Sequence, residues 1–120
     1  MKYLTAITLL AVSVGLVLAD GLKSQIVGKW SEIGGKDQIE FAANGTFTGN
    51  MVQNGMPQVP LPVAGTYVVE NGGKVSLQHT GGYPMVWNVK ISLSGNLTIL
   101  YEKGGLIKTD HTKAEFKRSK

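Results

Sequence analysis

Few side chains in this sequence could carry out chemistry, and their types exclude several kinds of site. The 120 residues include no cysteine, so a thiolate metal site, a cysteine nucleophile and a disulfide scaffold are excluded. The two histidines, His79 and His111, are too few for a histidine-rich metal site. The Gly-x-Ser-x-Gly, His-Glu-x-x-His, P-loop and Rossmann patterns are absent as well. We therefore expect a protein that is not an enzyme and that needs no metal or cofactor.

Two groupings of charged residues come close to a catalytic or metal-binding pattern. Asp110 and His111 are adjacent, but neighbours on a strand point to opposite faces, so a catalytic dyad is not expected. Glu32, Asp37 and Glu40 lie near one predicted hairpin, where three carboxylates could hold a cation. Glu40 projects outward from its strand, however, and three solvated surface charges are the favoured interpretation.

His79 is the strongest candidate for a polar group inside a ligand pocket. It shares the strand parity of the apolar Val75 and Leu77, so its ring is predicted to point inward near a strand end. Tyr67 and Tyr101 would join it there, because a small-molecule site combines an apolar cavity with a few convergent polar groups. The simpler alternative is a half-exposed histidine at the rim of the fold.

A proline-rich segment, Gln53–Pro62, is the second candidate. Its prolines favour a stiff loop, and its apolar side chains are costly to expose unless they are covered or used. These side chains are Met56, Val59 and Leu61. We expect a binding partner to touch this loop, together with a rim that carries Tyr83 or His79. Alternatively, the loop folds back and covers the end of the fold without binding anything.

The remaining pattern is a succession of short β-rich runs separated by glycine-containing turns. Asn-Gly, Gly-Gly and Ser-Gly pairs supply the positive φ that tight hairpins require, and apolar and polar residues alternate within the runs. No segment has convincing helical periodicity. The runs are predicted at Ile26–Ile33, Asp37–Ala42, Thr46–Val52, Gly65–Glu70, Lys74–Thr80, Met85–Ser92, Asn96–Glu102 and His111–Arg118.

Eight such strands in simple succession form an antiparallel meander. Its first and last strands would be unpaired edges, which favours their pairing with each other to close a barrel. An open meander leaves the first and last strands unpaired on one side, whereas a barrel removes both edges. We therefore predict an all-β, up-and-down, eight-stranded barrel, with an open sandwich as the alternative. The interior of such a barrel either holds one small ligand or is filled by side chains. Filling is favoured by the large rings, which are Trp30, Phe41, Phe47, Tyr67, Trp87 and Phe116.

Residues 1–19 are typical of a secretory signal peptide. A basic start precedes an uncharged apolar run over Leu4–Leu18. Val17 and Ala19 satisfy the small-residue rule for cleavage, which is therefore predicted just before Asp20. An uncleaved N-terminal anchor is the alternative.

Residues 20–120 are then long enough for one domain with one modest core. Export without any cysteine favours a closed, hydrogen-bonded architecture in the periplasm or outside the cell, with no membrane span after cleavage. The whole sequence has a formal net charge of +4. Basic residues gather near the C-terminus at Lys108, Lys113, Lys117, Arg118 and Lys120. Because Asp110 and Glu115 dilute that cluster, a solvated strand is favoured and no nucleic acid is expected as a partner.

Both ends of the predicted barrel resemble those of lipocalins. The first strand opens with Gly-Lys-Trp at residues 28–30, where lipocalins carry a Gly-x-Trp motif, and the last strand carries Phe-Lys-Arg at residues 116–118. The resemblance implies that Gly28 permits a close approach of the chain and that Trp30 plugs the barrel. It also implies that Arg118 packs across the Trp30 ring, a cation–π contact.

More closely, the sequence resembles the short, secreted, lipocalin-like domains of bacteria, a calycin-type family of unknown function. Its order of motifs spans Ile26–Arg118, nearly the whole predicted domain. Besides the two end motifs, the residues that carry the resemblance are Ile39-Glu40-Phe41, Asn44-Gly45-Thr46-Phe47-Thr48-Gly49 and Gly65-Thr66-Tyr67-Val68-Val69. The resemblance implies a barrel and no particular activity.

These observations favour a small, exported binding module that acts as a monomer. We expect its ligand to be a small apolar or aromatic molecule, bound at the barrel mouth beneath the Gln53–Pro62 loop. One alternative is an inhibitor or adaptor that binds an extracellular protein through that loop or through a free Asp20–Gln25 arm. Another is a structural module of the cell envelope with a filled barrel.

Overall fold

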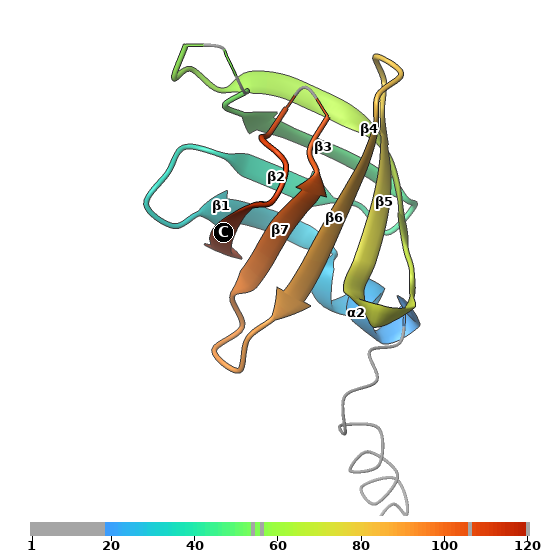
Figure 1. Ribbon diagram of the computed structural model, residues 1–120. Coiled ribbons are helices and arrows are strands. Elements are labelled where there is room, and N and C mark those ends of the chain that lie inside the picture. Colours follow the sequence, from blue (N-terminus) through green and yellow to red (C-terminus); the bar gives the residue numbers. More distant parts are fainter. Residues whose placement is uncertain (1–18, 54, 56, 106, 120) are drawn as a thin grey trace, which may run out of the picture.

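The computed structural model describes residues 19–53, 55, 57–105 and 107–119. Within these residues, eight antiparallel strands follow one another in chain order and close into one barrel (Figure 1). They are β1 (Gly28–Glu32), β2 (Gln38–Phe41), β3 (Thr46–Met51), β4 (Leu61–Val69), β5 (Lys74–His79), β6 (Pro84–Ile91), β7 (Leu97–Lys103) and β8 (Thr112–Arg118). The predicted all-β, up-and-down barrel is therefore confirmed, and the open sandwich is wrong.

Pairing of β1 with β8 closes the barrel. Trp30 lies opposite Arg118, and Glu32 lies opposite Phe116, in antiparallel register. The first and last strands therefore pair with each other instead of presenting the unpaired edges that favour aggregation.

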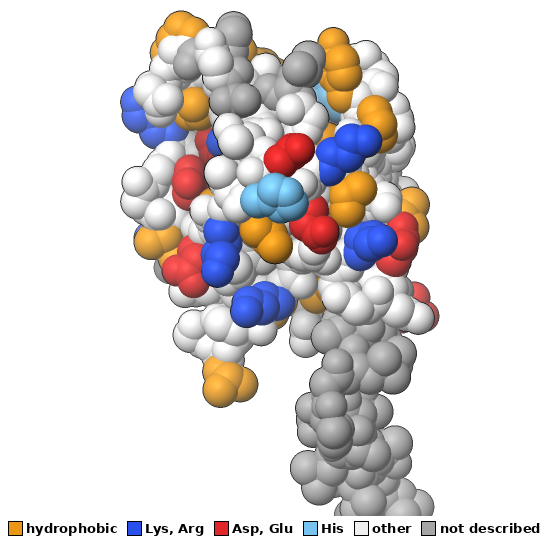
Figure 2. Space-filling view, in the orientation of Figure 1, with side chains coloured by type: hydrophobic (Ala, Val, Ile, Leu, Met, Phe, Trp, Pro, Cys, Tyr) orange, Lys and Arg blue, Asp and Glu red, His pale blue; other side chains and the backbone are white. Residues whose placement is uncertain are grey.

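The outer face of β8 is charged, whereas the inward-facing residues of β7 and β8 are mostly apolar. On β8, Phe116 is buried while Lys113, Glu115 and Lys117 are exposed. Figure 2 shows acidic and basic side chains interspersed over this face of the molecule. The alternation predicted for the last strand is therefore present, and these two lysines lie in solvent as expected.

Alternate connections of the barrel meet at the same end. At one end, here called the closed end, a short helix, α2 (Ala19–Ile26), packs near β4, β6 and the 3-10 turn η1 (Asn71–Gly73) (Figure 1). The other end is here called the open end. It is formed by the connections at residues 33–37, 52–60, 80–83 and 104–111.

Helix α2 covers the closed end and is not the free arm that the sequence predicted. Leu22 and Ile26, which lie one turn apart on the same face, are 4% and 0% exposed. The expectations of a free Asp20–Gln25 arm and of no helix are therefore wrong. Packing of this apolar face against the barrel stabilises a helix that is too short to form alone.

The carbonyl groups at the end of α2 are bound by residues of the two closing strands. The indole Nε1 of Trp30 donates to the carbonyl of Ile26 at 2.8 Å. Arg118 donates to the carbonyl of Val27 at 2.7 Å and to that of Gln25. Its guanidinium carbon also lies 4.2 Å from the centroid of the Trp30 ring, a cation–π contact. Acceptors that a helix end leaves open are thus satisfied by the barrel.

Gly28 makes room for this contact. Its φ of 131° is a conformation that side chains rarely adopt, and a Cβ there would lie 2.5 Å from Nη1 of Arg118. The residues of the two lipocalin-like motifs, Gly28, Trp30, Phe116 and Arg118, therefore lie on the paired strands β1 and β8.

Strand β4 begins at Leu61, inside the segment that was predicted to be a loop. Pro62 lies opposite Asn50 of β3, whereas the described pairing of β4 with β5 begins only at Gly65. Pro62 therefore belongs to a part of β4 with a partner on one side, where a proline is tolerated. The loop is correspondingly shorter than Gln53–Pro62.

Aromatic rings fill the middle of the barrel. Trp87 lies 6.5 Å from Phe41, 6.5 Å from Phe47 and 5.1 Å from Tyr101, measured between ring centroids. Phe41 in turn meets Tyr67 edge to face at 5.0 Å. Such edge-to-face pairs add to the stabilisation that burial provides. These rings occupy the space in the middle of the barrel that a ligand would need.

Candidate binding site at the open end

A cleft of about 540 Å³ lies at the open end. Its walls come from three connections, namely those between β1 and β2, between β3 and β4, and between β7 and β8. Most of its side chains are polar, and Val52 and Ile107 are its apolar members. Concave sites of this size at the mouth of a barrel suit small molecules.

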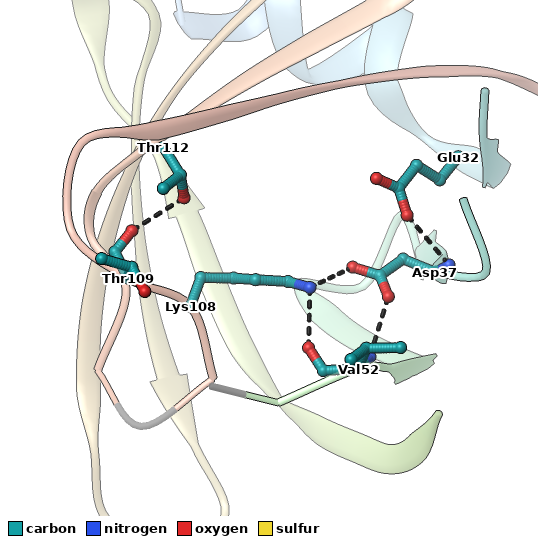
Figure 3. Close-up of polar contacts among 6 residues, drawn as sticks. All are labelled: Glu32, Asp37, Val52, Lys108, Thr109 and Thr112. Carbon is teal, nitrogen blue, oxygen red and sulfur yellow. Dashed lines mark hydrogen bonds and ion pairs between the residues drawn. The ribbon is translucent and has the colours of Figure 1, made fainter. Parts of the chain in front are cut away.

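A buried ion pair ties the three connections together. Asp37 is 1% exposed, and its Oδ2 lies 2.5 Å from Nζ of Lys108. The N–H of Val52 donates to Oδ1 of Asp37 at 2.8 Å, and Nζ of Lys108 donates to the Val52 carbonyl at 2.7 Å. Figure 3 shows this arrangement, here called the clasp (Asp37, Val52 and Lys108). The paired charge and the hydrogen bonds together offset the cost of burying the carboxylate.

Glu32 is hydrogen-bonded across the connection between β1 and β2, next to the clasp. Its N–H donates to the Asp37 carbonyl at 2.8 Å, and its Oε1 accepts from the Asp37 N–H at 3.2 Å. Its carboxylate lies so close to Gly35 that a Cβ at that position would collide with it. Glu32 lines the cleft as a carboxylate with no basic partner among the described residues.

Tyr101 lies next to the clasp on its inner side. The centroid of its ring is 5.9 Å from Nζ of Lys108, and the residue is 1% exposed. Burial raises the pKa of the phenol well above its usual value, and the negative charges of Asp37 and Glu32 raise it further. Tyr101 therefore keeps its proton at neutral pH and can donate a hydrogen bond.

Trp87 packs edge to face against Tyr101. Their ring centroids are 5.1 Å apart, their planes are 90° apart, and Trp87 is fully buried. Neither the Tyr101 hydroxyl nor the Trp87 Nε1 has a hydrogen-bond partner in the described part of the chain. By contrast, the Nε1 of Trp30 and the hydroxyl of Tyr67 each donate to a backbone carbonyl.

The three residues predicted to share one pocket lie in different surroundings. The hydroxyl of Tyr67 donates to the carbonyl of Ala42 at 2.7 Å, in the connection between β2 and β3 at the closed end. His79 ends β5 at the open end, where its Nδ1 accepts from the Gly81 N–H at 3.0 Å. Its Nε2 is buried without a partner among the residues that the structure describes. The structure therefore does not bring Tyr67 together with His79 and Tyr101.

The described part of the proline-rich segment contributes polar side chains to the cleft, and its described apolar side chains, Val59 and Leu61, are not in the lining. Gln53 and Gln58 line the cleft, and the Gln58 carbonyl accepts from Nζ of Lys36 at 3.2 Å. Leu61 is half-buried at the start of β4 and is not part of this lining. The segment therefore forms one wall of the cleft.

The other residues predicted near that loop are exposed or lie outside the description. Val59 is 57% exposed and Tyr83 is 45% exposed, with the Tyr83 ring centroid 6.2 Å from that of His79. Met56 lies outside the described residues. The rim of the open end therefore presents apolar side chains to solvent.

Sequence reasoning missed the clasp. It treated Asp37 and Lys108 as solvated charges, and for Asp37 this is wrong because the carboxylate is buried against Lys108. Strand parity was the available signal, since Asp37 shares the inward orientation of Ile39 and Phe41. The cation site considered at Glu32, Asp37 and Glu40 is not supported: among the described residues, no three His, Asp or Glu side chains are close enough to hold a metal ion.

The clasp, the two unpaired donors and the cleft define the candidate site. No family model, curated protein or solved structure matches this chain. Among the described residues, no helix is both long and apolar enough to cross a membrane.

Proposed function

We propose that this protein is an exported, monomeric binding module whose small ligand occupies the cleft at the open end. The observation that carries the proposal is the clasp, in which a carboxylate that is 1% exposed joins three connections. A buried ion pair adds little net stability compared with apolar packing, but it favours one defined arrangement of the groups around it. Here the groups held in place are the three connections that form the walls of the cleft at the open end.

The lining of the cleft supports a small apolar or aromatic molecule that carries at least one polar group. Val52 and Ile107 offer apolar contacts, and the ring of Tyr101 lies next to Lys108. Glu32 and Lys36 add polar groups that would orient a ligand. The two apolar side chains would hold the apolar part of such a ligand, while the more numerous polar groups of the lining orient it.

Export is proposed from the N-terminal sequence, whose residues 1–18 lie outside the described part. Helix α2 begins at Ala19, and cleavage before Asp20 leaves the buried Leu22 and Ile26 in place. We expect the mass of the exported protein to correspond to a chain that begins at Asp20. A protein that retains Met1 would contradict the proposed cleavage.

The lipocalin-like family stays a proposal as well. Its support is the contact between Trp30 and Arg118, which join the two motifs on which the resemblance rests. The resemblance carries no activity with it, so the ligand has to be found by experiment.

A fragment screen read by ¹⁵N NMR tests the site. We expect aromatic fragments to move the amide signals of Val52, Ile107 and Lys108. Gln53→Trp places a large ring in the cleft and should abolish these shifts. Gln78→Trp, on the exposed outer face of β5, is the matched control and should leave them unchanged. Shifts confined to residues outside the cleft would contradict the proposal.

The exposed rim favours a second candidate, an inhibitor or adaptor that binds an extracellular protein. Val59 and Tyr83 are both exposed at the open end, where a protein partner could cover them. Inhibition of purified extracellular proteases should then be lost in Val59→Ser/Tyr83→Ser, with an unchanged melting temperature. If neither small molecules nor proteins bind, the structural envelope module becomes the better explanation.

A further inference from the structure

Two hydrogen-bond donors inside the barrel have no acceptor among the residues that the structure describes. The side chains of Tyr101 and Trp87 are 1% and 0% exposed, and neither the hydroxyl nor the indole N–H finds a partner within the described residues. Roughly 90% or more of buried polar groups in proteins are hydrogen-bonded, because leaving one unpaired is costly. Two such donors on rings in contact therefore mark a place that an acceptor from outside the chain would complete.

These donors lie next to the candidate cleft. Tyr101 and Trp87 belong to the neighbouring strands β7 and β6, at the point where their register shifts between Val86 and Asn88. Lys108 lines the cleft, and its Nζ is 5.9 Å from the centroid of the Tyr101 ring. Neither Tyr101 nor Trp87 lines the cleft itself, so a molecule in the cleft would reach the Tyr101 phenol only by moving past Lys108.

The charges around these donors favour an uncharged acceptor. Asp37 and Glu32 act on Tyr101 electrostatically and oppose its negative form, so they also oppose an anionic ligand at the same place. Lys108 and Asp37 neutralise each other as an ion pair, so the negative charge that remains to oppose an anionic ligand is that of Glu32. A cation is not matched either, since the indole N–H of Trp87 is a donor only. A neutral oxygen with lone pairs fits both donors.

We infer that the ligand is a small neutral molecule with a carbonyl-type oxygen, which the Tyr101 hydroxyl and the Trp87 indole N–H bind together. Its apolar part would lie in the cleft against Val52 and Ile107. This inference rests on the proposed small-molecule function and names the ligand class for the same site. An aryl ketone is the simplest molecule of this class.

Acetophenone and ethylbenzene are matched probes, because they differ by the replacement of a carbonyl with a methylene. The protein carries its own spectroscopic control, since Trp30 already donates to Ile26 whereas Trp87 has no described acceptor. We expect acetophenone to move the Trp87 indole signal downfield and to leave that of Trp30 in place. Ethylbenzene should bind about a hundredfold more weakly, because it lacks the acceptor of two hydrogen bonds that are worth about tenfold each.

Two variants with the same chemical change test the role of the hydroxyl. Tyr101→Phe removes an unpaired hydroxyl and keeps the ring, so the protein should fold, and its affinity for acetophenone should fall about tenfold. Its affinity for ethylbenzene should stay unchanged. Tyr67→Phe removes a hydroxyl that is bonded to Ala42 at the closed end, and it should bind both probes like the wild type.

The outcomes separate this inference from the proposed function. Equal affinities for the two probes, or cleft amide shifts with an unmoved Trp87 signal, would overturn the ligand class while the binding site stands. The ligand class would also be overturned if a water molecule stayed hydrogen-bonded to both donors at saturating acetophenone. Tighter binding of the anion benzoate than of acetophenone would overturn it as well. If neither probe moves any signal of the cleft, both the inference and the proposed small-molecule function are wrong.

Discussion

At the scale of single residues, two buried tyrosines show how position decides what a phenol does. Tyr67 donates to the carbonyl of Ala42 and so stabilises a connection at the closed end. Tyr101 has no acceptor in the described part of the chain and lies near the clasp. Burial raises the pKa of both phenols, and Asp37 and Glu32 add to the rise at Tyr101. The hydroxyl of Tyr67 is therefore used within the fold, whereas the hydroxyl of Tyr101 could donate to the proposed ligand.

The pKa of Tyr101 makes the stability of the barrel sensitive to alkaline pH. Because the folded pKa lies above the unfolded value, the unfolded chain loses this proton first as the pH rises past about 10. The folded state then binds more protons, and the free energy of unfolding falls by up to about 1.4 kcal/mol per pH unit. We expect Tyr101→Phe to remove this part of the decline in urea unfolding at alkaline pH. A decline as steep as that of the wild type would contradict the shift.

The clasp should behave as a coupled pair rather than as two separate charges. Lys108→Met leaves the Asp37 carboxylate buried and unpaired, which should lower the free energy of unfolding by about 3 kcal/mol or more. Asp37→Asn/Lys108→Met removes both charges and keeps an oxygen for the Val52 N–H, so it should recover most of that loss. Urea unfolding of the two variants measures the difference. Equal stability of the single and double variants would show that the ion pair does not hold the connections together.

At the scale of elements, α2 is part of the barrel rather than an appendage. Its apolar face is buried, and its last carbonyls are bound by Trp30 and Arg118 from the two strands that close the sheet. A domain without cysteine has no disulfide to stabilise it, so it depends on such packing. The helix therefore covers one end of the barrel, and the cleft lies at the other end.

Truncation of Ile26 tests this role of α2. Ile26→Ala removes a fully buried side chain but keeps the carbonyl that accepts from Trp30, so it should cost about 2–5 kcal/mol. Gln25→Ala, at the neighbouring exposed position, is the control and should change stability by less than about 0.5 kcal/mol. Thermal unfolding followed by circular dichroism measures both. A loss for Ile26→Ala no larger than that of the control would mean that α2 does not contribute to the core.

The elements that could be predicted are those with a local signal. Alternation and glycine-containing turns are properties of neighbouring residues, so all eight strands and their order were predictable. Helix α2 was missed because only Leu22 and Ile26 mark its apolar face. The start of β4 was missed because Pro62 argues against a strand, although one-sided pairing tolerates it. The clasp joins residues that only the folded barrel brings together, and no local pattern reveals such a pair.

At the scale of the whole molecule, one pairing differs from all the others that the structure describes. Every other strand pair joins neighbours in the sequence, whereas β1 and β8 join the two ends of the domain. Ser31 and Ser119, which contact each other there, are 88 positions apart. Closing so long a loop has an entropic cost that hairpin formation avoids. The hairpins can therefore form early, and closure of the barrel has to come late.

This order of events predicts different kinetic effects at the two locations. Leu77→Ala, in the central β5, should mainly slow folding, because its contacts would already exist in the transition state. Phe116→Ala, in β8, should mainly accelerate unfolding, because its contacts would form after the transition state. Each truncation should cost about 2–5 kcal/mol at equilibrium, enough to separate the two rates. Stopped-flow Trp fluorescence over a range of urea concentrations measures both limbs. If Phe116→Ala slows folding as much as Leu77→Ala does, the closing pair of strands belongs to the folding nucleus and the proposed order is wrong.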